Sequence, residues 1–421
     1  MHFPHEIEHF KQKAIEWLRD FEVCCLLDNN NSINALDLRD IECVIAAGVK
    51  KEIKGRGKGD WDALNDTVNG IDDAHLFGYL SYDLKNQIEK LSSNHSDQIG
   101  FDHLYFFEPI HLIVIYSNGS YLIQSPIENI LDEILKTEEI HLTAHPVHIK
   151  PKVSREKYIE NVHAIQQHII DGDVYELNYC VEFYDEHARI DPFHVYQKLK
   201  QFSPTPFGAF LRVKDRFVLC ASPERFIKKR GDTLYSQPIK GTVKRGADIN
   251  EDKQLIQQLL HSEKERAENL MIVDLVRNDL ARSSKTGTIK VEELFGIYSF
   301  SQVHQMISTV TSQINENTSA VESIKNAFPM GSMTGAPKVM AMELIEKYEN
   351  TKRGLYSGAI GYFAPNSNFD FNVVIRSIQY NAIHQYISFE VGSAITYDSN
   401  AEMEYEECLL KAQAMVKALA N

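Results

Sequence analysis

Hydrophobic residues recur at two different spacings along the chain, and the two spacings predict both helices and strands. In residues 6–20 they follow the 3.6-residue period of a helix, and residues 158–170 repeat that period up to the turn Asp171-Gly172-Asp173. Alternating or continuous apolar runs predict strands, mostly of an antiparallel sheet. These runs are residues 21–27, 75–83, 104–107, 122–123, 174–179, 207–213 and 217–221. The chain is therefore expected to mix helices and strands, with a β-rich first third.

The segments between these runs are polar and divide the chain further. Residues 50–60 carry charge and glycine without the order of a phosphate-binding loop, so an exposed loop is predicted there. Residues 136–152 have no clear period and form the best linker candidate; their histidines lack the second cluster that a metal site would require. A long helix is expected from Asn250 to Leu275, and another from Glu402 onward.

Composition and charge exclude several classes of protein. The net charge of −15 argues against a nucleic-acid partner, although it does not exclude a small anionic substrate. The six cysteines show neither metal-ligand nor redox spacing, which is typical of buried thiols in a reducing compartment. The N-terminus lacks a signal sequence and the apolar runs are too short to span a bilayer, so a cytoplasmic protein without a membrane partner is expected.

One short stretch, Pro238-Ile239-Lys240-Gly241-Thr242, has the character of a ligand site. Pro238 fixes its own φ angle, and Gly241 allows the backbone to approach a ligand closely, so Lys240 is expected on a turn at the end of a strand. By itself the stretch is more typical of a surface hairpin with a solvated lysine. Other motifs have to decide between these interpretations.

Two pairs of glutamates are candidates for a metal site. Glu265 and Glu268 lie one helical turn apart, and Glu404 and Glu407 repeat that spacing near the C-terminus, with Lys411 four residues beyond. Two such helices facing each other would offer the oxygen ligands that Mg²⁺ prefers. Each pair read singly is an ordinary solvated helix face.

Glycine-rich segments between the two pairs suggest backbone close to a ligand. Gly331 and Gly335 flank a predicted helix start, where N–H groups favour an anion. Tyr356 and Arg376 follow on nearby predicted strands and would together suit a carboxylate. The pattern does not match a phosphate loop.

Taken jointly and in this order, the motifs resemble those of the chorismate-utilising enzymes. They are Ser-Pro-Glu-Arg-Phe at 222–226, Pro-Ile-Lys-Gly-Thr at 238–242, the run 266–280, Gly-Ser-Met-Thr-Gly-Ala-Pro-Lys at 331–338 and Glu-Tyr-Glu-Glu at 404–407. The resemblance is dense from about residue 155 and thinner before. It implies an α/β (α+β) fold of two antiparallel β-sheets packed together with helices outside, and a single chorismate-binding unit over 1–421. Residues 1–150 would form its β-rich N-terminal part, and 151–421 the catalytic part.

Lys240 narrows the resemblance, since anthranilate synthases characteristically have alanine there. It implies the subgroup that replaces the C4 hydroxyl of chorismate with an amino group on the way to folate, using ammonia from a separate glutamine amidotransferase (glutaminase) subunit. In that subgroup Lys240 would attack C2 as a covalent nucleophile and Glu224 would protonate the departing hydroxyl. Both roles need shifted pKa values, a neutral amine and a protonated carboxyl.

The same resemblance implies roles for the other candidates. Arg376, Tyr356 and Lys411 would hold substrate carboxylates, Gly241 and Thr242 would line the ring site, His304 would lie beside it, and Gly392 would belong to a glycine triplet that donates to substrate. Glu265, Glu268, Glu404 and Glu407 would surround Mg²⁺.

Three departures from the family pattern leave alternatives open. The glycine triplet reads Gly392-Ser393-Ala394, and Ala394 tolerates a positive φ less well. Glu176 stands where many relatives carry glutamine and the isochorismate-forming relatives carry a lysine base. A carboxylate at this position argues against an isochorismate-forming reaction. The tryptophan-binding motif is imperfect at Leu26-Leu27-Asp28-Asn29, which makes tryptophan control doubtful. Anthranilate synthase component I and a non-catalytic chorismate-binding subunit remain alternatives.

Overall fold

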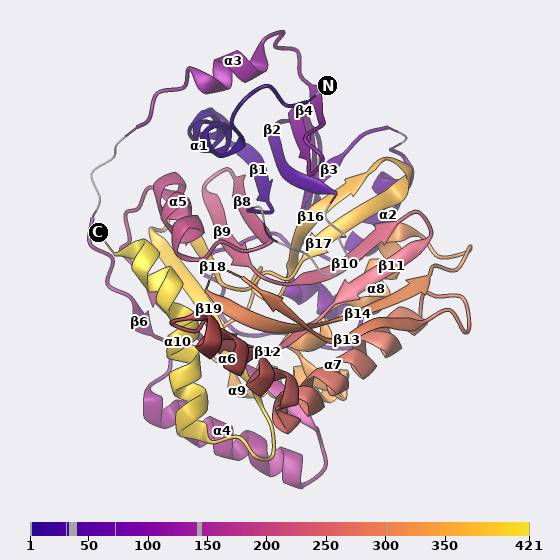
Figure 1. The fold of residues 1–421 in the computed structure, drawn as a ribbon, viewed down its shortest axis with the longest axis vertical. Coiled ribbons are helices and arrows are strands. Elements are labelled where there is room, and N and C mark those ends of the chain that lie inside the picture. The colour runs from indigo at the N-terminus through magenta and orange to yellow at the C-terminus, as the bar shows by residue number, and fades with distance from the viewer. Residues whose placement is uncertain are drawn as a thin grey trace.

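The computed structural model of the chain (Figure 1) describes residues 2–30, 32, 40–71, 73–140, 145–300 and 302–420. Its α-helices are α1 (Ile7–Trp17), α2 (Asp60–Asn69), α3 (Ile130–Leu135), α4 (Arg155–Ile170), α5 (Pro192–Phe202), α6 (Ile249–His261), α7 (Glu263–Ala281), α8 (Ala320–Ala327), α9 (Lys338–Tyr348) and α10 (Ala401–Leu419). Short 3₁₀ turns are η1 (Leu18–Asp20), η3 (Tyr82–Gln87), η4 (Gly331–Met333) and η5 (Pro365–Ser367).

The strands pair in antiparallel fashion throughout the described chain. They are β1 (Val23–Asp28), β2 (Ile41–Gly55), β3 (Leu76–Leu80), β4 (Leu104–Tyr116), β5 (Tyr121–Gln124), β6 (Lys150–Pro151), β7 (Glu176–Asp185), β8 (Phe207–Val213), β9 (Arg216–Ser222), β10 (Arg225–Arg230), β11 (Thr233–Gln237), β12 (Ile239–Lys244), β13 (Lys290–Ser299), β14 (Val303–Gln313), β15 (Gly335–Ala336), β16 (Ala359–Ala364), β17 (Asn368–Asn372), β18 (Ser377–Asn381) and β19 (Tyr386–Ile395).

The strands fall into two layers. Layer 1 runs in the order β7, β19, β18, β9, β8, β1, and layer 2 in the order β3, β16, β17, β10, β11, β14, with β12 and β13 both on β14. The long strands β2 and β4 belong to both layers: one part of β2 pairs with β1, while the start of β4 pairs with β3. A register shift between Val49 and Lys51, next to Gly48 at φ +70°, marks the bend in β2. The two sheets expected from sequence are thus joined into one continuous hydrogen-bonded sheet.

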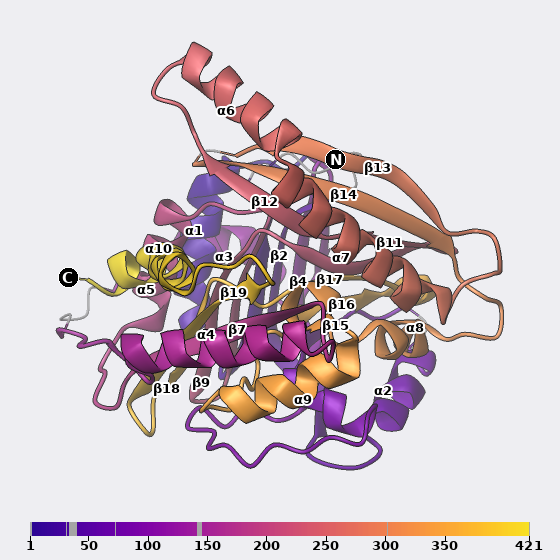
Figure 2. The ribbon, with the colours of Figure 1, turned by 90° about the horizontal axis from the view of Figure 1, so that it is seen from below.

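Three hydrophobic cores stabilise this arrangement. One lies between the layers and contains Cys25, Phe77 and Leu211. A second packs the outer face of layer 1 against α1, α4, α5 and α10, and a third packs the outer face of layer 2 against α2, α7 and α8. Figure 2 shows α7 running beside β12 and β14, with α4 and α9 on the opposite side of the molecule. Helices therefore cover both outer faces, as predicted.

Two predictions of local structure outside the Lys240 segment are wrong. Residues 50–55, expected as a loop, are the end of β2, because this part of the strand pairs with β4 despite its charge. The long helix expected from Asn250 is two helices, α6 and α7, divided at Ser262, whose backbone is extended and whose Oγ accepts a hydrogen bond from the N–H of Glu265 at 3.3 Å. The break sets the start of the helix that carries Glu265 and Glu268.

The N-terminal part shares the sheet with the rest of the chain. Strand β1 pairs with β8, and β3 pairs with β16. In the linker candidate 136–152, residues 141–144 lie outside the described residues, including His141, and β6 pairs with β7. All six cysteines are buried free thiols, as expected. In the described ranges, no helix has the length and apolar character needed to cross a membrane.

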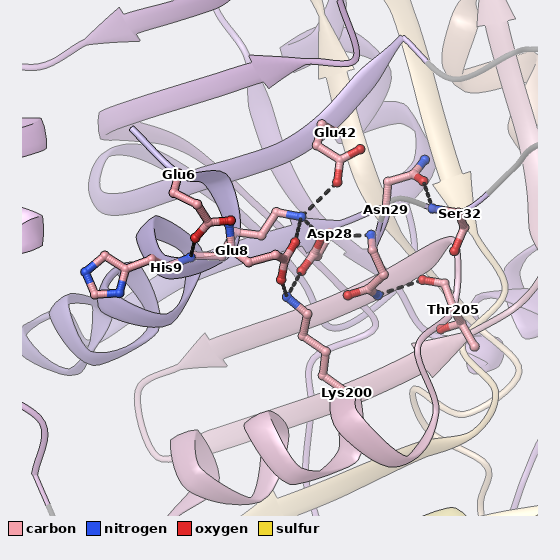
Figure 3. Close-up of polar contacts among 11 residues, drawn as sticks. Glu6, Glu8, His9, Asp28, Asn29, Ser32, Glu42, Lys200 and Thr205 are labelled. Atoms are coloured by element: carbon pink, nitrogen blue, oxygen red, sulfur yellow. Dashed lines mark hydrogen bonds and ion pairs between the residues drawn. The ribbon is translucent and has the colours of Figure 1, made fainter. Parts of the chain in front are cut away.

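A buried ion network joins α1 to the sheet (Figure 3). Lys11 is fully buried, and its Nζ lies 2.7 Å from Asp28 Oδ1 and 2.8 Å from Glu42 Oε1. Lys200 Nζ lies 2.6 Å from Asp28 Oδ2. Burial raises the pKa of Asp28, but the two lysines outweigh it and hold the pKa below its usual range. Asp28 belongs to the segment 26–29, which resembles a tryptophan-binding motif imperfectly. Its carboxylate is already engaged by two cations of the chain itself, Lys11 and Lys200.

Replacing Lys11 should reveal how much the network contributes to stability. Lys11→Met removes the cation that Asp28 and Glu42 share, while Asp28 keeps Lys200, so the free energy of unfolding should fall by an amount at the low end of about 3–5 kcal/mol. Lys50→Met is the matched control, because the Lys50 side chain is 63% exposed and its pairing with Glu108 contributes little. Equal urea midpoints for the two variants would contradict the assignment.

Candidate active site

Lys240 lies on a bulged strand rather than on a turn. Strand β12 pairs with β14 with a register shift between Ile239 and Thr242, and Gly241 within this bulge has φ +91°. A Cβ at Gly241 would come 3.1 Å from Glu265 Oε2, so the glycine allows α7 to approach. The Lys240 side chain is 13% exposed and its Nζ lies 4.0 Å from Oε2 of Glu176 on β7. The site therefore forms where the β12 side of layer 2 meets the β7 edge of layer 1.

Carboxylates surround the Lys240 amine. Burial lowers the pKa of Lys240, but the charges of Glu176, Glu268, Glu224 and Glu407 outweigh burial and raise it. This direction is opposite to the one expected for a neutral nucleophile. The chain's own carboxylates favour the ammonium form, so a neutral amine requires that part of their charge be offset.

Glu224 has the properties of a proton donor. It follows β9 in the segment that crosses from layer 1 to layer 2, and its N–H donates to Ser222 Oγ at 3.2 Å. The residue is 5% exposed. Burial raises the pKa of Glu224 to about 7, against the opposing effects of Ser332 and Lys240. The carboxyl therefore stays partly protonated near neutral pH, as a general acid requires.

The four predicted metal ligands are placed unequally. Burial raises the pKa of both Glu265 and Glu268 on α7, and the Glu268 charge raises that of Glu265 further. Burial also acts on Glu407, but Lys411, at 2.7 Å, lowers its pKa on balance. Glu404 Oε1 instead accepts a hydrogen bond from Ser399 Oγ at 2.9 Å.

The donor set suits a hard cation, because it consists of carboxylates with little compensating charge. The charge of Glu407 contributes to the raised pKa values of both Glu265 and Glu268. Across the part of the chain that the structure describes, however, no three His, Cys, Asp or Glu side chains converge closely enough to hold a metal ion. Ligation would require Glu404 to release Ser399 and the two helices to approach each other.

Arg376 is a free, partly buried cation. It lies in the segment that returns from layer 2 to layer 1, with φ +49°, and within the described residues its guanidinium has no hydrogen bond or ion pair. It lines a small cavity together with Gln305, Thr205 and Phe300. A guanidinium without a protein partner is suited to binding a carboxylate.

Tyr356, Gly392 and Lys411 lie on the β7 side of the site. The hydroxyl of the buried Tyr356 lies 3.6 Å from Cys180 Sγ, and Cys180 is the strand partner of Gly392. Lys411 Nζ donates to the Gly392 carbonyl at 2.9 Å. A Cβ on Gly392 would come 2.5 Å from the Tyr179 carbonyl oxygen, so the residue at this position must be glycine for the strands to pair this closely.

His304, expected beside the ring site, makes its side-chain hydrogen bonds with Ser299 and Asp252. The His304 ring is fully buried, with Nδ1 2.8 Å from Ser299 Oγ and Nε2 2.9 Å from Asp252 Oδ1, so it links β14 to α6. The next residue, Gln305, lines the cavity that Arg376 also lines. Gln305 is the strand partner of the exposed Thr242 on β12. The Gln305 Oε1 atom is buried without a hydrogen-bond partner. The sequence motifs did not single out Gln305. Successive side chains of a strand point to opposite faces, so His304 and Gln305 could have been expected to face different sides of β14.

Comparison with known proteins identifies the class to which this site belongs. The family model described as chorismate binding enzyme matches residues 23–417. The chain belongs to this family of chorismate-binding enzymes.

Individual relatives differ in the reaction that their names describe. Aminodeoxychorismate synthase component 1 of Bacillus subtilis (strain 168) is 35% identical over 81% of this chain and 76% of its own length. Anthranilate synthase component 1 of Acetivibrio thermocellus is 34% identical over 98% of this chain and 84% of its own length. The structure of anthranilate synthase component I from Streptococcus pneumoniae TIGR4 superposes with a TM-score of 0.78 at 26% identity, covering 91% of this chain and 93% of that one.

The pKa of Glu224 yields a prediction for the pH dependence. A carboxyl that titrates at about 7 is protonated below that pH, so kcat/KM for chorismate should fall as the pH rises through about 7. Glu224→Gln should lose roughly 10²–10⁴-fold in turnover while still binding chorismate. Glu186→Gln, a change at an exposed ion pair, is the control. A profile that stays flat to pH 9 would exclude Glu224 as the acid.

Proposed function

We propose that this chain is aminodeoxychorismate synthase component I. It would convert chorismate to 4-amino-4-deoxychorismate, for p-aminobenzoate and folate biosynthesis, in a Mg²⁺-dependent reaction. The observation that carries this proposal is Lys240, whose side chain is 13% exposed and which lies on a strand bulge where Glu176, Glu224 and Glu268 exert their charges. A lysine at this position offers an amine for covalent attack, whereas anthranilate synthases characteristically have alanine.

The proposed reaction proceeds in two displacements. The neutral Lys240 amine forms a bond to C2 of the ring, both conjugated ring double bonds shift, and the C4–O bond breaks as Glu224 donates its proton, so that water leaves. Ammonia then forms a bond at C4 and gives one proton to the Glu224 carboxylate, both double bonds shift back, and the C2–N bond to Lys240 breaks, which restores the neutral amine. Arg376 and Tyr356 hold substrate carboxylates during both steps.

Glu265, Glu268, Glu404 and Glu407 are the residues that would hold Mg²⁺. The bound ion supplies positive charge that offsets the ring carboxylate and these glutamates. The same offset favours a neutral Lys240, since the glutamate charges contribute to its raised pKa.

Ammonia is proposed to come from a glutamine amidotransferase subunit. The second candidate function is that of anthranilate synthase component I, which the match to the Acetivibrio thermocellus protein over 98% of this chain favours. A non-catalytic chorismate-binding subunit is the third, and the intact Lys240 and Glu224 argue against it.

One assay separates these three functions. The purified chain, with chorismate, Mg²⁺ and an ammonium salt, should form aminodeoxychorismate, identified by mass, without release of pyruvate. Excess chelator should abolish the product, and so should Glu268→Gln, which removes a hard anionic ligand without changing side-chain volume. Stoichiometric pyruvate with anthranilate would assign the second function, and an unchanged chorismate pool the third.

Substitution of Lys240 tests its covalent role. Lys240→Ala should remove most of the amination but leave chorismate binding largely intact, because Arg376 and Tyr356 do not act through the amine. Lys240→Arg keeps the positive charge but has no neutral amine at working pH. If Lys240→Arg retains near-normal amination, Lys240 acts through its charge and not as a nucleophile.

A further inference from the structure

A second, acidic cavity lies next to the proposed active site. It has an empty volume of about 360 Å³, open solvent at its mouth included. Its inner wall includes Glu182 of β7, Glu390 and Ser388 of β19 and Gln379 of β18, and its outer wall includes Asp97 of the segment before β4. The roles proposed above use none of these residues.

Two buried polar side chains in this cavity lack protein partners. Glu390 is 4% exposed and Gln379 is 3% exposed. Neither side chain makes a hydrogen bond or ion pair with any residue in the described ranges, although both line the cavity. Because both side chains line the cavity and neither is used by a protein partner, a molecule in the cavity would find a carboxyl and an amide available for hydrogen bonding.

The cavity has an excess of negative charge. Glu390 and Glu182 are direct partners in the β19–β7 pairing, so their side chains lie on the same face. The neighbouring cations have other partners: Arg353 Nη2 lies 2.6 Å from Glu349 Oε1, and Lys352 Nζ lies 3.8 Å from Asp83 Oδ2. Burial raises the pKa of Glu390 well above its usual range, and the charge of Glu182 raises it further. A small cation in the cavity would relieve this repulsion.

The cavity borders the proposed substrate site. The next pair of inward-facing residues along β19 and β7 is Gly392 and Cys180, and Cys180 contacts the Tyr356 hydroxyl. Leu355, adjacent to Tyr356, also lines the cavity. A cation held by Glu390 would therefore sit behind the Tyr356 side of the substrate site.

We propose that this cavity binds ammonium, with Glu390 and Glu182 as its anionic ligands and Gln379 and Ser388 as neutral acceptors. The proposal rests on the proposed amination, in which ammonia is the second substrate. Ammonium carries four N–H donors and one charge, which matches two carboxylates, an amide oxygen and a hydroxyl. A divalent metal fits less well, since in the described residues no three acidic, histidine or cysteine side chains converge on one point.

Kinetics with ammonium salts test the site directly. Glu390→Gln keeps the side-chain volume but removes the charge, so the KM for ammonium should rise at least tenfold while the KM for chorismate changes less than twofold. Glu186→Gln, at an exposed ion pair beyond the end of β7, should change neither value. An unchanged ammonium KM in Glu390→Gln overturns the proposal. If Glu390→Gln does not fold, Ser388→Ala removes one acceptor and should raise the ammonium KM alone.

Thallium(I) provides a readout that does not depend on activity. It resembles ammonium in charge and size, so a crystal soaked in a thallium(I) salt should show an anomalous peak beside Glu390. Ammonium should displace the peak, and Glu390→Gln should lack it. Absence of the peak, or its persistence in excess ammonium, overturns the proposal. A displaceable peak in a protein that forms no aminated product would retain the cation site but overturn its role in substrate supply, and the fault would then lie in the proposed function.

Discussion

The contact between Lys240 and Glu176 joins the two ends of one folded sheet, and the site is arranged around it. Glu176 begins β7 at the edge of layer 1, and Lys240 lies on β12 at the edge of layer 2, with 4.0 Å between Nζ and Oε2. The chain crosses between the layers twice near this contact, before β10 and before β18. Glu224 lies in the first crossing and Arg376 in the second. A proton donor and a free cation therefore lie in the two crossings, outside both layers.

Charge balance distinguishes the site from the rest of the interior. In the Lys11 network, burial is tolerated because Lys11 and Lys200 compensate the Asp28 carboxylate directly. Around Lys240 the carboxylates outnumber the cations, and the pKa values of Glu265 and Glu268 are raised by burial and by the charges of neighbouring carboxylates, Glu407 among them. Such an arrangement is costly for the protein alone, and a positively charged partner, as proposed for Mg²⁺, would offset that cost.

Alternate side chains of β7 and β19 point to the inner face of layer 1, and this inner row connects the proposed substrate site with the acidic cavity. Tyr179 and Val181 of β7 face outward into the core beneath α4 and α10, whereas Cys180 and Glu182 face the other way. This inner row contacts Tyr356 at one end and lines the acidic cavity at the other. One pair of strands thus serves both the proposed substrate site and the proposed ammonium site, while its outer face holds the helices.

The amino-acid sequence by itself determined the local elements and the set of chemical groups. Hydrophobic period predicts α1, α4 and the strands β1, β3, β4, β5, β7, β8 and β9, and the 3.6-residue repeat places Glu265 and Glu268 on one face of a helix. Only the tertiary structure decided what depends on residues distant in sequence. The charged residues 50–55 form a strand because β4 supplies hydrogen-bond partners, and the pKa of Lys240 rises because carboxylates from β7, α7 and α10 surround it. His304 likewise turns to Asp252 while Gln305 faces Arg376, since strand pairing fixes which side chain points inward.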